Sequence, residues 1–383
     1  MTFPDGRHHH FLLDGGQPPP YHLCMASTTS PAATTLHTIT LQPSGKTFSC
    51  TESGDILRAG LSSGIAMRYN CRSGVCRTCR GKLIAGKVDP GAVNPNYLSE
   101  ADKAAGYVHL CCAKPMGDCV VEVDEMPAGL QPSRLFPVRI MKMERLAPDV
   151  MQVVLGFPPN EPQHFSAGQY LNILLADGVT RSYSIASPPA TEGLRQLELH
   201  MRHMPGGLFT DRVFASLKVR DLLRIETPHG LFYLDEGSSK PMVMIASGTG
   251  FAPIKAIIEY SLLKNMRRPI HLYWGGRRRE DIYLHELASS WAAEHAHIHY
   301  TPVLSNATEA CVWQGREGFV HLAVMQDFPD LSSHQVYACG APVVVESARR
   351  DFSSVCGLPE NQFFADSFVS EADRVHEAAP ASA

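Results

Sequence analysis

Four cysteines with uneven spacing constrain this chain more than any other feature. Cys71 is followed after four residues by Cys76 and after two more by Cys79, and Cys111 comes 31 residues later. Two irons that share two sulfides need four soft thiolates, and this is the plant-type spacing of a [2Fe–2S] site. Gly74 inside the loop lets backbone N–H groups approach the cluster sulfurs. We therefore predict that the cluster ligands are Cys71, Cys76, Cys79 and Cys111.

Cys112 stands next to the fourth predicted ligand. In the usual pattern the residue after this ligand does not itself ligate, which favours Cys111. A zinc site and a set of buried thiols are the alternatives. Zinc sites often use paired C-x2-C units, and a single such unit is present in this sequence. The remaining cysteines of the chain outside the nicotinamide region are predicted to be buried thiols: Cys24, Cys50, Cys119, Cys311 and Cys356.

A short polar motif, Arg181-Ser182-Tyr183-Ser184, closes a predicted strand and suits a flavin. Alternation along the strand puts Arg181 and Tyr183 on one side and Ser184 on the other. The arginine can bind a pyrophosphate through two parallel hydrogen bonds, and the tyrosine ring can stack on the isoalloxazine. The Ser184 hydroxyl can form a hydrogen bond near the reactive flavin nitrogen. The motif therefore predicts an FAD site.

A glycine-rich turn supports this FAD site. It contains Gly206, Gly207 and Thr210 and opens a helix predicted over 209–217. Exposed N–H groups and the helix dipole at such an N-terminus favour an anion. We expect the FAD pyrophosphate to lie there.

A second glycine turn, Gly248-Thr249-Gly250, follows an apolar strand predicted over 241–246. An apolar helix predicted over 253–263 comes next, and Pro253 replaces the third glycine of the pattern G-x-G-x-x-G. A strand before this turn and a helix after it predict a dinucleotide-binding site.

Cys339 and Gly340 end another strand of the same predicted sheet. Parallel sheets bind ligands beyond the carboxyl ends of their strands, so this pair is expected near the nicotinamide. A buried thiol at the strand end is the alternative for Cys339. We take Ser184 and Cys339 as the residues nearest the reacting atoms.

Composition excludes several functions. The 34 basic and 38 acidic residues leave a net charge of −4, which gives no electrostatic basis for binding nucleic acid or an anionic membrane. No run approaches 18 consecutive apolar residues, and residues 1–24 lack the apolar core of a signal peptide. The protein is therefore expected in the cytoplasm, where cysteines stay reduced.

The organisation of the chain follows from its periodicity. Apolar residues at helical spacing, Ile56, Leu57 and Leu61, predict a helix over 51–63 with Thr51 as its cap. Short β-rich runs separated by Gly/Pro turns between 138 and 232 indicate a barrel or sandwich, and strands alternating with helices from 241 indicate a parallel sheet. Met25 is a candidate alternative start. The predicted segments are a disordered tail at 1–35, an iron–sulfur domain at 36–126, a linker at 127–137, an FAD-binding barrel at 138–236, an NAD-binding domain at 237–370 and a frayed tail at 371–383.

Taken together, the motifs resemble the ferredoxin–NADP⁺ reductase superfamily, in the subgroup with an N-terminal plant-type ferredoxin domain. Within it they look like the reductases of the CDP-6-deoxy-Δ3,4-glucoseen type and of bacterial aromatic oxygenases. The resemblance runs from about Leu36 to Ser370. It is carried by Cys-Arg-Ser-Gly-Val-Cys at 71–76, Leu-Cys-Cys-Ala at 110–113, Arg-Ser-Tyr-Ser at 181–184, Ser-Gly-Thr-Gly-Phe-Ala-Pro at 247–253, Tyr-Trp-Gly-Gly at 273–276, Tyr-Ala-Cys-Gly at 337–340 and Phe-Phe-Ala-Asp-Ser-Phe at 363–368.

The resemblance implies a β-grasp ferredoxin domain, an antiparallel FAD-binding β-barrel and a parallel α/β nicotinamide-binding domain. It implies that NADH, rather than NADPH, reduces FAD, and that electrons pass through the cluster to a partner protein such as a sugar dehydrase or an oxygenase component. It also implies that Phe364 covers one flavin face. A stand-alone flavin or ferric reductase and a non-enzymatic iron–sulfur redox sensor are the alternatives. The chain departs from many relatives at Arg77, where they have a small residue.

The loop around the cluster is strongly basic. Residues 68–82 contain five basic side chains and no acid: Arg68, Arg72, Arg77, Arg80 and Lys82. One interpretation is an exit surface for an acidic acceptor protein. The alternatives are a solvated face, hydrogen bonds to the cluster, and docking on the chain's own FAD domain.

Overall fold

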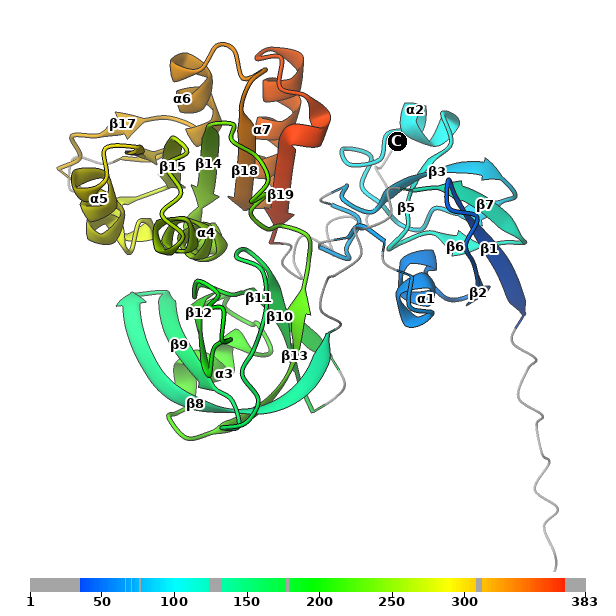
Figure 1. The fold of residues 1–383 in the computed structure, drawn as a ribbon, viewed down its shortest axis with the longest axis horizontal. Helices are drawn as coiled ribbons and strands as arrows, with labels where there is room; N and C mark the ends of the chain where they lie inside the picture. The colour runs from blue at the N-terminus through cyan, green and yellow to red at the C-terminus, as the bar shows by residue number, and fades with distance from the viewer. Residues whose placement is uncertain are drawn as a thin grey trace, which may run out of the picture. The chain divides into compact units, whose positions relative to one another are not determined.

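The computed structural model describes residues 35–65, 67–69, 71–75, 77–123, 133–176, 179–307 and 312–368. Several predictions from the sequence fall outside these ranges. They concern Cys24, Cys76 and Cys311, the predicted C-terminal tail, residues 1–34 of the predicted N-terminal tail, and the first part of the predicted linker. The described residues from Thr35 onward belong to one compact unit. Figure 1 shows three sheet-containing parts that follow one another along the chain, coloured blue to cyan, green, and green to red.

The first part is a mixed sheet with a helix against it. In the order β2-β1-β7-β3-β5, β1 and β7 are parallel and the other neighbours antiparallel. Alternation in β1 buries Ile39 and Leu41, which meet Ile56 and Leu57 of α1 in one core. Its elements are β1 (Leu36–Gln42), β2 (Thr47–Thr51), α1 (Ile56–Ser62), β3 (Arg80–Ala85), β4 (Val88–Asp89), α2 (Glu100–Ala104), β5 (Tyr107–His109), β6 (Lys114–Pro115) and β7 (Cys119–Glu122).

The start of α1 differs from the sequence interpretation, which extended this helix from Thr51 to Ser63. Thr51 instead pairs with Leu36 in the sheet. The helix begins after Asp55, whose carboxylate accepts a hydrogen bond of 2.7 Å from the Arg58 backbone N–H. Asp55 is therefore the cap, because its side chain satisfies a first-turn donor.

The second part is an antiparallel barrel. Its strands follow the order β11-β10-β13-β8-β9-β12, and a bridge between Ile185 and Leu199 joins the two ends of the sheet. The core lies inside, because alternate residues point inward, as Val153 and Leu155 do. Its elements are β8 (Arg134–Ala147), β9 (Val150–Gly156), β10 (Tyr170–Leu174), β11 (Thr180–Ser184), β12 (Gln196–Arg202), α3 (Thr210–Ala215) and β13 (Leu222–His229). Strand β8 begins at Arg134, inside the segment predicted as a linker.

The third part is a parallel sheet covered on both faces. Its order, β17-β16-β15-β14-β18-β19, reverses at β14, so the crevice for a ligand is expected beyond β14 and β18. Helices α4 and α5 pack on one face, and α6 and α7 on the other. Its elements are β14 (Met242–Ser247), η1 (Gly248–Gly250), α4 (Phe251–Leu263), β15 (Ile270–Gly276), η2 (Arg279–Asp281), α5 (His285–Glu294), β16 (Ile298–Leu304), β17 (Arg316–Glu317), α6 (Val320–Asp327), β18 (Gln335–Gly340), α7 (Pro342–Ser354), η4 (Glu360–Gln362) and β19 (Phe363–Ser367).

Buried thiols are confirmed where the structure describes them. Cys50, Cys119 and Cys356 are all almost fully buried within hydrophobic cores. Among the described residues, no helix is both long and apolar enough to cross a membrane.

Candidate functional site

Strand pairing brings two of the predicted cluster ligands together. Cys79 immediately precedes β3 and Cys111 follows β5, and these strands pair with Arg80 opposite His109. The Leu110 N–H donates to the Cys79 carbonyl at 3.0 Å. As a result the Sγ atoms of Cys79 and Cys111 lie 3.3 Å apart.

The loop between α1 and β3 is held around these thiols. The buried His109 ring donates from Nδ1 to the Gly74 carbonyl at 2.7 Å, and burial lowers the pKa of His109 to about 4. Gly74 has φ +78°, and a Cβ there would lie 2.9 Å from the Cys112 Sγ. A side chain at this position would therefore both strain the backbone and meet the thiols. Immediately before Gly74, the Ser73 N–H donates to the Cys71 Sγ at 3.5 Å.

Three of the described thiols lie together where the cluster is predicted. The Cys111 Sγ is 3.6 Å from the Cys112 Sγ and 3.3 Å from the Cys79 Sγ. Contacts with Cys112 and then Cys79, together with burial, raise the pKa of Cys111 well above its usual value. Crowded, buried sulfurs resist ionisation unless cations accept them as ligands, as ferric ions do. Because Cys111 and Cys112 both place a sulfur in this group of thiols, the assignment of Cys111 as the fourth cluster ligand stays a prediction.

The flavin motif lies on β11 at the rim of the barrel. Tyr183 is partly buried beside Phe209, with ring centroids 5.9 Å apart, and desolvation raises the pKa of its hydroxyl. Ser184 is buried and pairs with Tyr170 of β10. Arg181 is half-buried, and its Nη1 donates to the Thr180 carbonyl at 3.0 Å.

The glycine turn before α3 is shaped by its own hydrogen bonds. Thr210 Oγ1 donates to the Met204 carbonyl at 3.0 Å, and the Gly207 N–H donates to the same carbonyl at 2.8 Å. The Gly206 N–H donates to Asp211 at 3.1 Å. The helix itself covers Thr210–Ala215, shorter than the predicted 209–217. In the structure, the N–H groups of Gly206 and Gly207 and the Thr210 hydroxyl are therefore engaged within the turn, and the Asp211 carboxylate lies at the Gly206 N–H.

The dinucleotide turn lies against the end of β18. A Cβ at Gly250 would lie 2.1 Å from the Cys339 carbonyl oxygen, so only glycine fits there. Gly248 has φ +54°, and its carbonyl accepts a hydrogen bond of 3.2 Å from Trp274 Nε1. Thr249 completes the turn, and Pro253 lies in the first turn of α4.

An arginine that the sequence analysis did not assign points at this turn. Arg202, the last residue of β12, comes within 3.5 Å of where a Gly248 Cβ would lie. Its Nη1 donates to Asp281 at 3.0 Å, while its Nη2 is buried and has no hydrogen-bond partner among the residues that the structure describes. A phosphate of a bound dinucleotide would satisfy this donor. The sequence signal is weak, because a strand-end arginine is common.

The barrel meets the parallel sheet where the flavin and nicotinamide rings are expected to react. Asp366 of β19 pairs with Cys339 of β18, and its carboxylate accepts a hydrogen bond of 3.4 Å from the Ser184 hydroxyl. Burial and then the charge of Asp366 raise the pKa of Cys339 well above its usual value. The predicted pair Ser184 and Cys339 thus converges on one carboxylate, which the sequence analysis passed over although it lies within the motif at 363–368.

Phe364 lies on β19, two residues before Asp366. Its ring stacks on Tyr337, with centroids 4.7 Å apart. Phe368, which the sequence analysis did not assign, lies nearer the strand ends, because its N–H donates to the Gly340 carbonyl at 2.9 Å. Gly340 has φ +136° and packs closely on Ser247, which keeps β18 against the dinucleotide turn.

A buried polar network joins the barrel to the NAD-binding sheet. Lys255 of α4 donates to the Ala186 carbonyl at 3.1 Å and lies 3.6 Å from Glu198. Glu198 accepts a hydrogen bond of 2.7 Å from His200, whose Nδ1 lies 2.8 Å from the Tyr283 hydroxyl. Burial lowers the pKa of His200, so its ring stays neutral. These contacts hold α4 and Tyr283 against the barrel strand that carries Glu198 and His200.

Comparisons with known proteins agree with this arrangement. Three family models match in succession: the 2Fe-2S iron-sulfur cluster binding domain over residues 39–116, the oxidoreductase FAD-binding domain over 137–233 and the oxidoreductase NAD-binding domain over 244–350. The predicted cofactor set and fold class are confirmed at the level of these domains.

Full-length relatives carry the same domains. The chain is 39% identical to the CDP-6-deoxy-L-threo-D-glycero-4-hexulose-3-dehydrase reductase of Yersinia pestis, over 86% of this chain and 98% of that protein. It is 31% identical to the reductase component of phenol 2-monooxygenase from a Pseudomonas species, over 89% of this chain and 97% of that protein. Among solved structures, an Amycolatopsis cytochrome P450 reductase matches with a TM-score of 0.70 and 30% identity, covering 87% of this chain and 99% of that one.

The chain therefore belongs to the iron–sulfur flavoprotein reductases, in which a [2Fe–2S] domain is joined to FAD-binding and NAD-binding oxidoreductase domains. It is an NAD(P)H-dependent oxidoreductase whose domains form an electron-transfer chain from nicotinamide through FAD to the cluster.

Proposed function

We propose that this chain oxidises NADH and delivers the electrons one at a time to a separate acceptor protein. The observation that supports this most is the junction of Ser184, Cys339 and Asp366, where the barrel meets the end of the parallel sheet. When bound there, FAD accepts a hydride from the nicotinamide, and the cluster carries electrons singly. The chain's own contribution is positioning, since hydride transfer between two rings needs no separate acid or base.

The residues divide into three groups by role. Arg181, Gly206, Gly207 and Thr210 hold the FAD pyrophosphate, while Tyr183 stacks on the isoalloxazine and the Ser184 hydroxyl forms a hydrogen bond with its ring. Gly248, Thr249, Gly250 and Pro253 hold the NADH phosphates, and Arg202 donates to them from Nη2. Cys339 and Gly340 flank the nicotinamide, and the aromatic cover comes from Phe364 together with Phe368. Cys71, Cys76, Cys79 and Cys111 bind the cluster.

NADH is the preferred donor in this proposal. Arg277 and Arg278, which follow β15, have exposed side chains. Their backbone N–H groups donate to the Asp281 carboxylate at 2.8 and 3.0 Å. Arg279 lies 3.5 Å from Glu286. The Asp281 carboxylate thus holds the loop backbone, and the side chains of Arg277 and Arg278 remain in solvent. In solvent these side chains would bind the 2′-phosphate of NADPH only weakly.

Steady-state kinetics test this preference. We expect kcat/KM for NADH to exceed that for NADPH, and Arg277→Ala to leave the NADH value unchanged. A kcat/KM for NADPH equal to or above that for NADH, lost in Arg277→Ala, would show that the arginines bind the 2′-phosphate.

For the acceptor, we propose a sugar dehydrase ahead of an oxygenase component, because the dehydrase reductase shares 39% of its residues with this chain and the oxygenase reductases about 31–32%. We place its site of action in the cytoplasm, a reducing compartment in which the thiols of the described residues stay reduced. Anaerobic NADH titration followed by mixing with each class of acceptor is the test. Flavin that is not bleached by NADH would favour a redox sensor, and full turnover with free flavin or ferric iron alone would favour a stand-alone reductase.

A further inference from the structure

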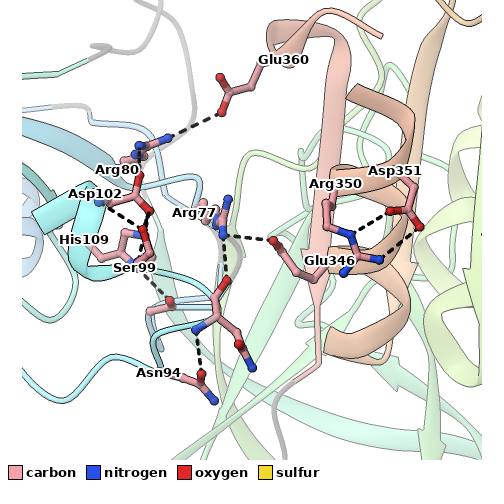
Figure 2. Close-up of polar contacts among 12 residues, drawn as sticks. Arg77, Arg80, Asn94, Ser99, Asp102, His109, Glu346, Arg350, Asp351 and Glu360 are labelled. Carbon is pink, nitrogen blue, oxygen red and sulfur yellow. Dashed lines mark hydrogen bonds and ion pairs between the residues drawn. The ribbon is translucent and has the colours of Figure 1, made fainter. Parts of the chain in front are cut away.

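The basic loop around the cluster contacts the chain's own FAD- and NAD-binding domains. Arg72 reaches His229 at the end of β13, and Arg77 reaches Glu346 on α7. Arg80 lies near Glu360, which precedes β19. Figure 2 shows Arg77 and Arg80 on one side and the two acidic residues on the other. We call Arg72, Arg77 and Arg80 the cluster-loop arginines.

Arg77 makes the most direct of these contacts. Its Nη2 atom lies 2.8 Å from the Asn96 carbonyl oxygen and 3.0 Å from Glu346 Oε1 (Figure 2). Arg77 therefore connects the iron–sulfur domain to α7. The two side chains are only 23% and 20% exposed. Burial raises the pKa of Glu346, and Arg77 is the largest of the positive charges that oppose this shift. A pair shielded in this way is stronger than one in open solvent.

Arg72 connects the loop to the flavin strand. Its Nη2 donates to His229 Nδ1 at 3.3 Å, while His229 Nε2 donates to Glu226 at 2.9 Å. Asn172 Nδ2 donates to the same Glu226 carboxylate at 3.4 Å, and Asn172 accepts a hydrogen bond of 2.7 Å from Ser182. Ser182 lies between Arg181 and Tyr183, so this path ends within the FAD motif.

Arg80 differs from the other two. It is held within its own domain by Asp102 at 2.5 Å (Figure 2). Its guanidinium also lies 3.7 Å from the centroid of the Tyr107 ring. Its distance to Glu360 is 3.8 Å, and Glu360 is 72% exposed. Solvent screens such a pair, so Glu360 provides a matched control for Glu346.

The backbone conformation at Arg77 indicates that its side-chain contacts offset a conformational cost. Arg77 has φ +60°, a left-handed conformation that costs a residue other than glycine about 1 kcal/mol. Glycine would avoid this cost but would lose both contacts of the guanidinium. Arg77→Gly therefore removes the side chain without disturbing the loop backbone.

We propose that the Arg77–Glu346 ion pair, supported by the Arg72–His229 contact, is an intramolecular docking surface that positions the cluster for electron transfer from the flavin. Arg77 and Glu346 are positioning residues. Each transfer removes one electron from the reduced flavin and adds one to the oxidised cluster, and neither side chain exchanges a proton. This inference rests on the proposed function and assigns the loop to the chain's own domains rather than to an acidic acceptor.

The test is a charge swap on the full-length chain loaded with FAD and cluster. The variants are Arg77→Gly, Arg77→Glu, Glu346→Arg and the double variant Arg77→Glu/Glu346→Arg, with Glu360→Arg as the control. Anaerobic stopped-flow mixing with NADH separates flavin bleaching from cluster reduction, with rates normalised to bound iron. Hydrogen–deuterium exchange of the α7 peptide (Pro342–Ser354) reports docking without any turnover.

We expect each single variant at 77 or 346 to slow cluster reduction about three- to ten-fold while flavin bleaching keeps its rate. Exchange in the α7 peptide should rise in the same variants. The double variant should recover both, and Glu360→Arg should match the unmodified chain. Unchanged cluster reduction and exchange in the single variants, or no recovery in the double variant, would overturn the proposal.

Two further results have distinct meanings. If charge reversal at Arg77 slows only delivery to an added acceptor protein, the loop is an exit surface and the docking proposal is wrong. If NADH fails to bleach the flavin of the unmodified chain, the proposed function is wrong, and the exchange measurement still decides whether the ion pair docks the domains.

Discussion

The contact of Gly250 with the end of β18 predicts a large effect from one methyl group. In Gly250→Ala the new Cβ would lie 2.1 Å from the Cys339 carbonyl oxygen and 2.7 Å from the Gly340 nitrogen. Both atoms belong to backbone in the sheet, so the dinucleotide turn and β18 must separate by about 1 Å to reach normal contact. Overpacking of this kind costs ~1–3 kcal/mol of unfolding free energy.

The same displacement lies where the nicotinamide is proposed to bind. A misplacement of about 1 Å at a reacting centre can slow a reaction ~100-fold, so we expect kcat/KM for NADH to fall by roughly 10- to 100-fold. Urea denaturation and stopped-flow flavin bleaching measure the two effects. Gly237→Ala is the control, because its Cβ would meet only Asp235 Oδ1 at 3.5 Å. A Gly250→Ala variant with unchanged stability and unchanged bleaching would refute the close approach on which this reasoning depends.

Two other predictions follow from the thiols and from the buried network. Cys111→Ser should abolish or severely weaken the visible iron–sulfur spectrum while Cys112→Ser preserves it, and the opposite pattern would move the ligand to Cys112. Despite burial, hydrogen bonding from His200 and the charge of Lys255 lower the pKa of Glu198 to about 2, from a usual 4.5. Because the pKa of Glu198 is lowered in the folded state, its carboxylate stabilises the fold above pH 4.5, and this stabilisation is lost as the pH falls below 4.5. Because His200 stays neutral in the fold, protonation of the unfolded chain below pH 6.5 favours unfolding. Unfolding free energy should therefore fall as the pH drops below 6.5, because of His200, and fall further below pH 4.5, because of Glu198. Glu198→Gln should flatten the curve below pH 4.5, and an equally steep curve in that range would contradict the assignment.

Local patterns predicted the parts of the site that one segment can specify. The spacing of Cys71 and Cys79 defines a loop, and the strand, glycine turn and helix around Gly248 define a dinucleotide crevice, without knowledge of distant contacts. The choice of cap for α1 failed because Thr51 and Asp55 are both suitable residues, and only the pairing of β1 with β2 removes Thr51 from the helix.

The remaining site residues depend on contacts between distant segments. Asp366 matters because β19 pairs with β18 and faces Ser184, which lies 182 positions earlier in the chain. Arg202 matters because the barrel packs on the dinucleotide turn. Neither relation has a local period or spacing that a single sequence could reveal.

The ring of Trp274 provides an optical reporter at the dinucleotide turn. It is fully buried, stacks on Phe251 with centroids 3.7 Å apart, and donates its indole N–H to the Gly248 carbonyl. The chain contains three tryptophans in all. Emission from this indole is therefore sensitive to any ligand that shifts the turn, and its quenching on addition of a nicotinamide dinucleotide would follow binding directly, with neither flavin colour nor turnover needed as a signal.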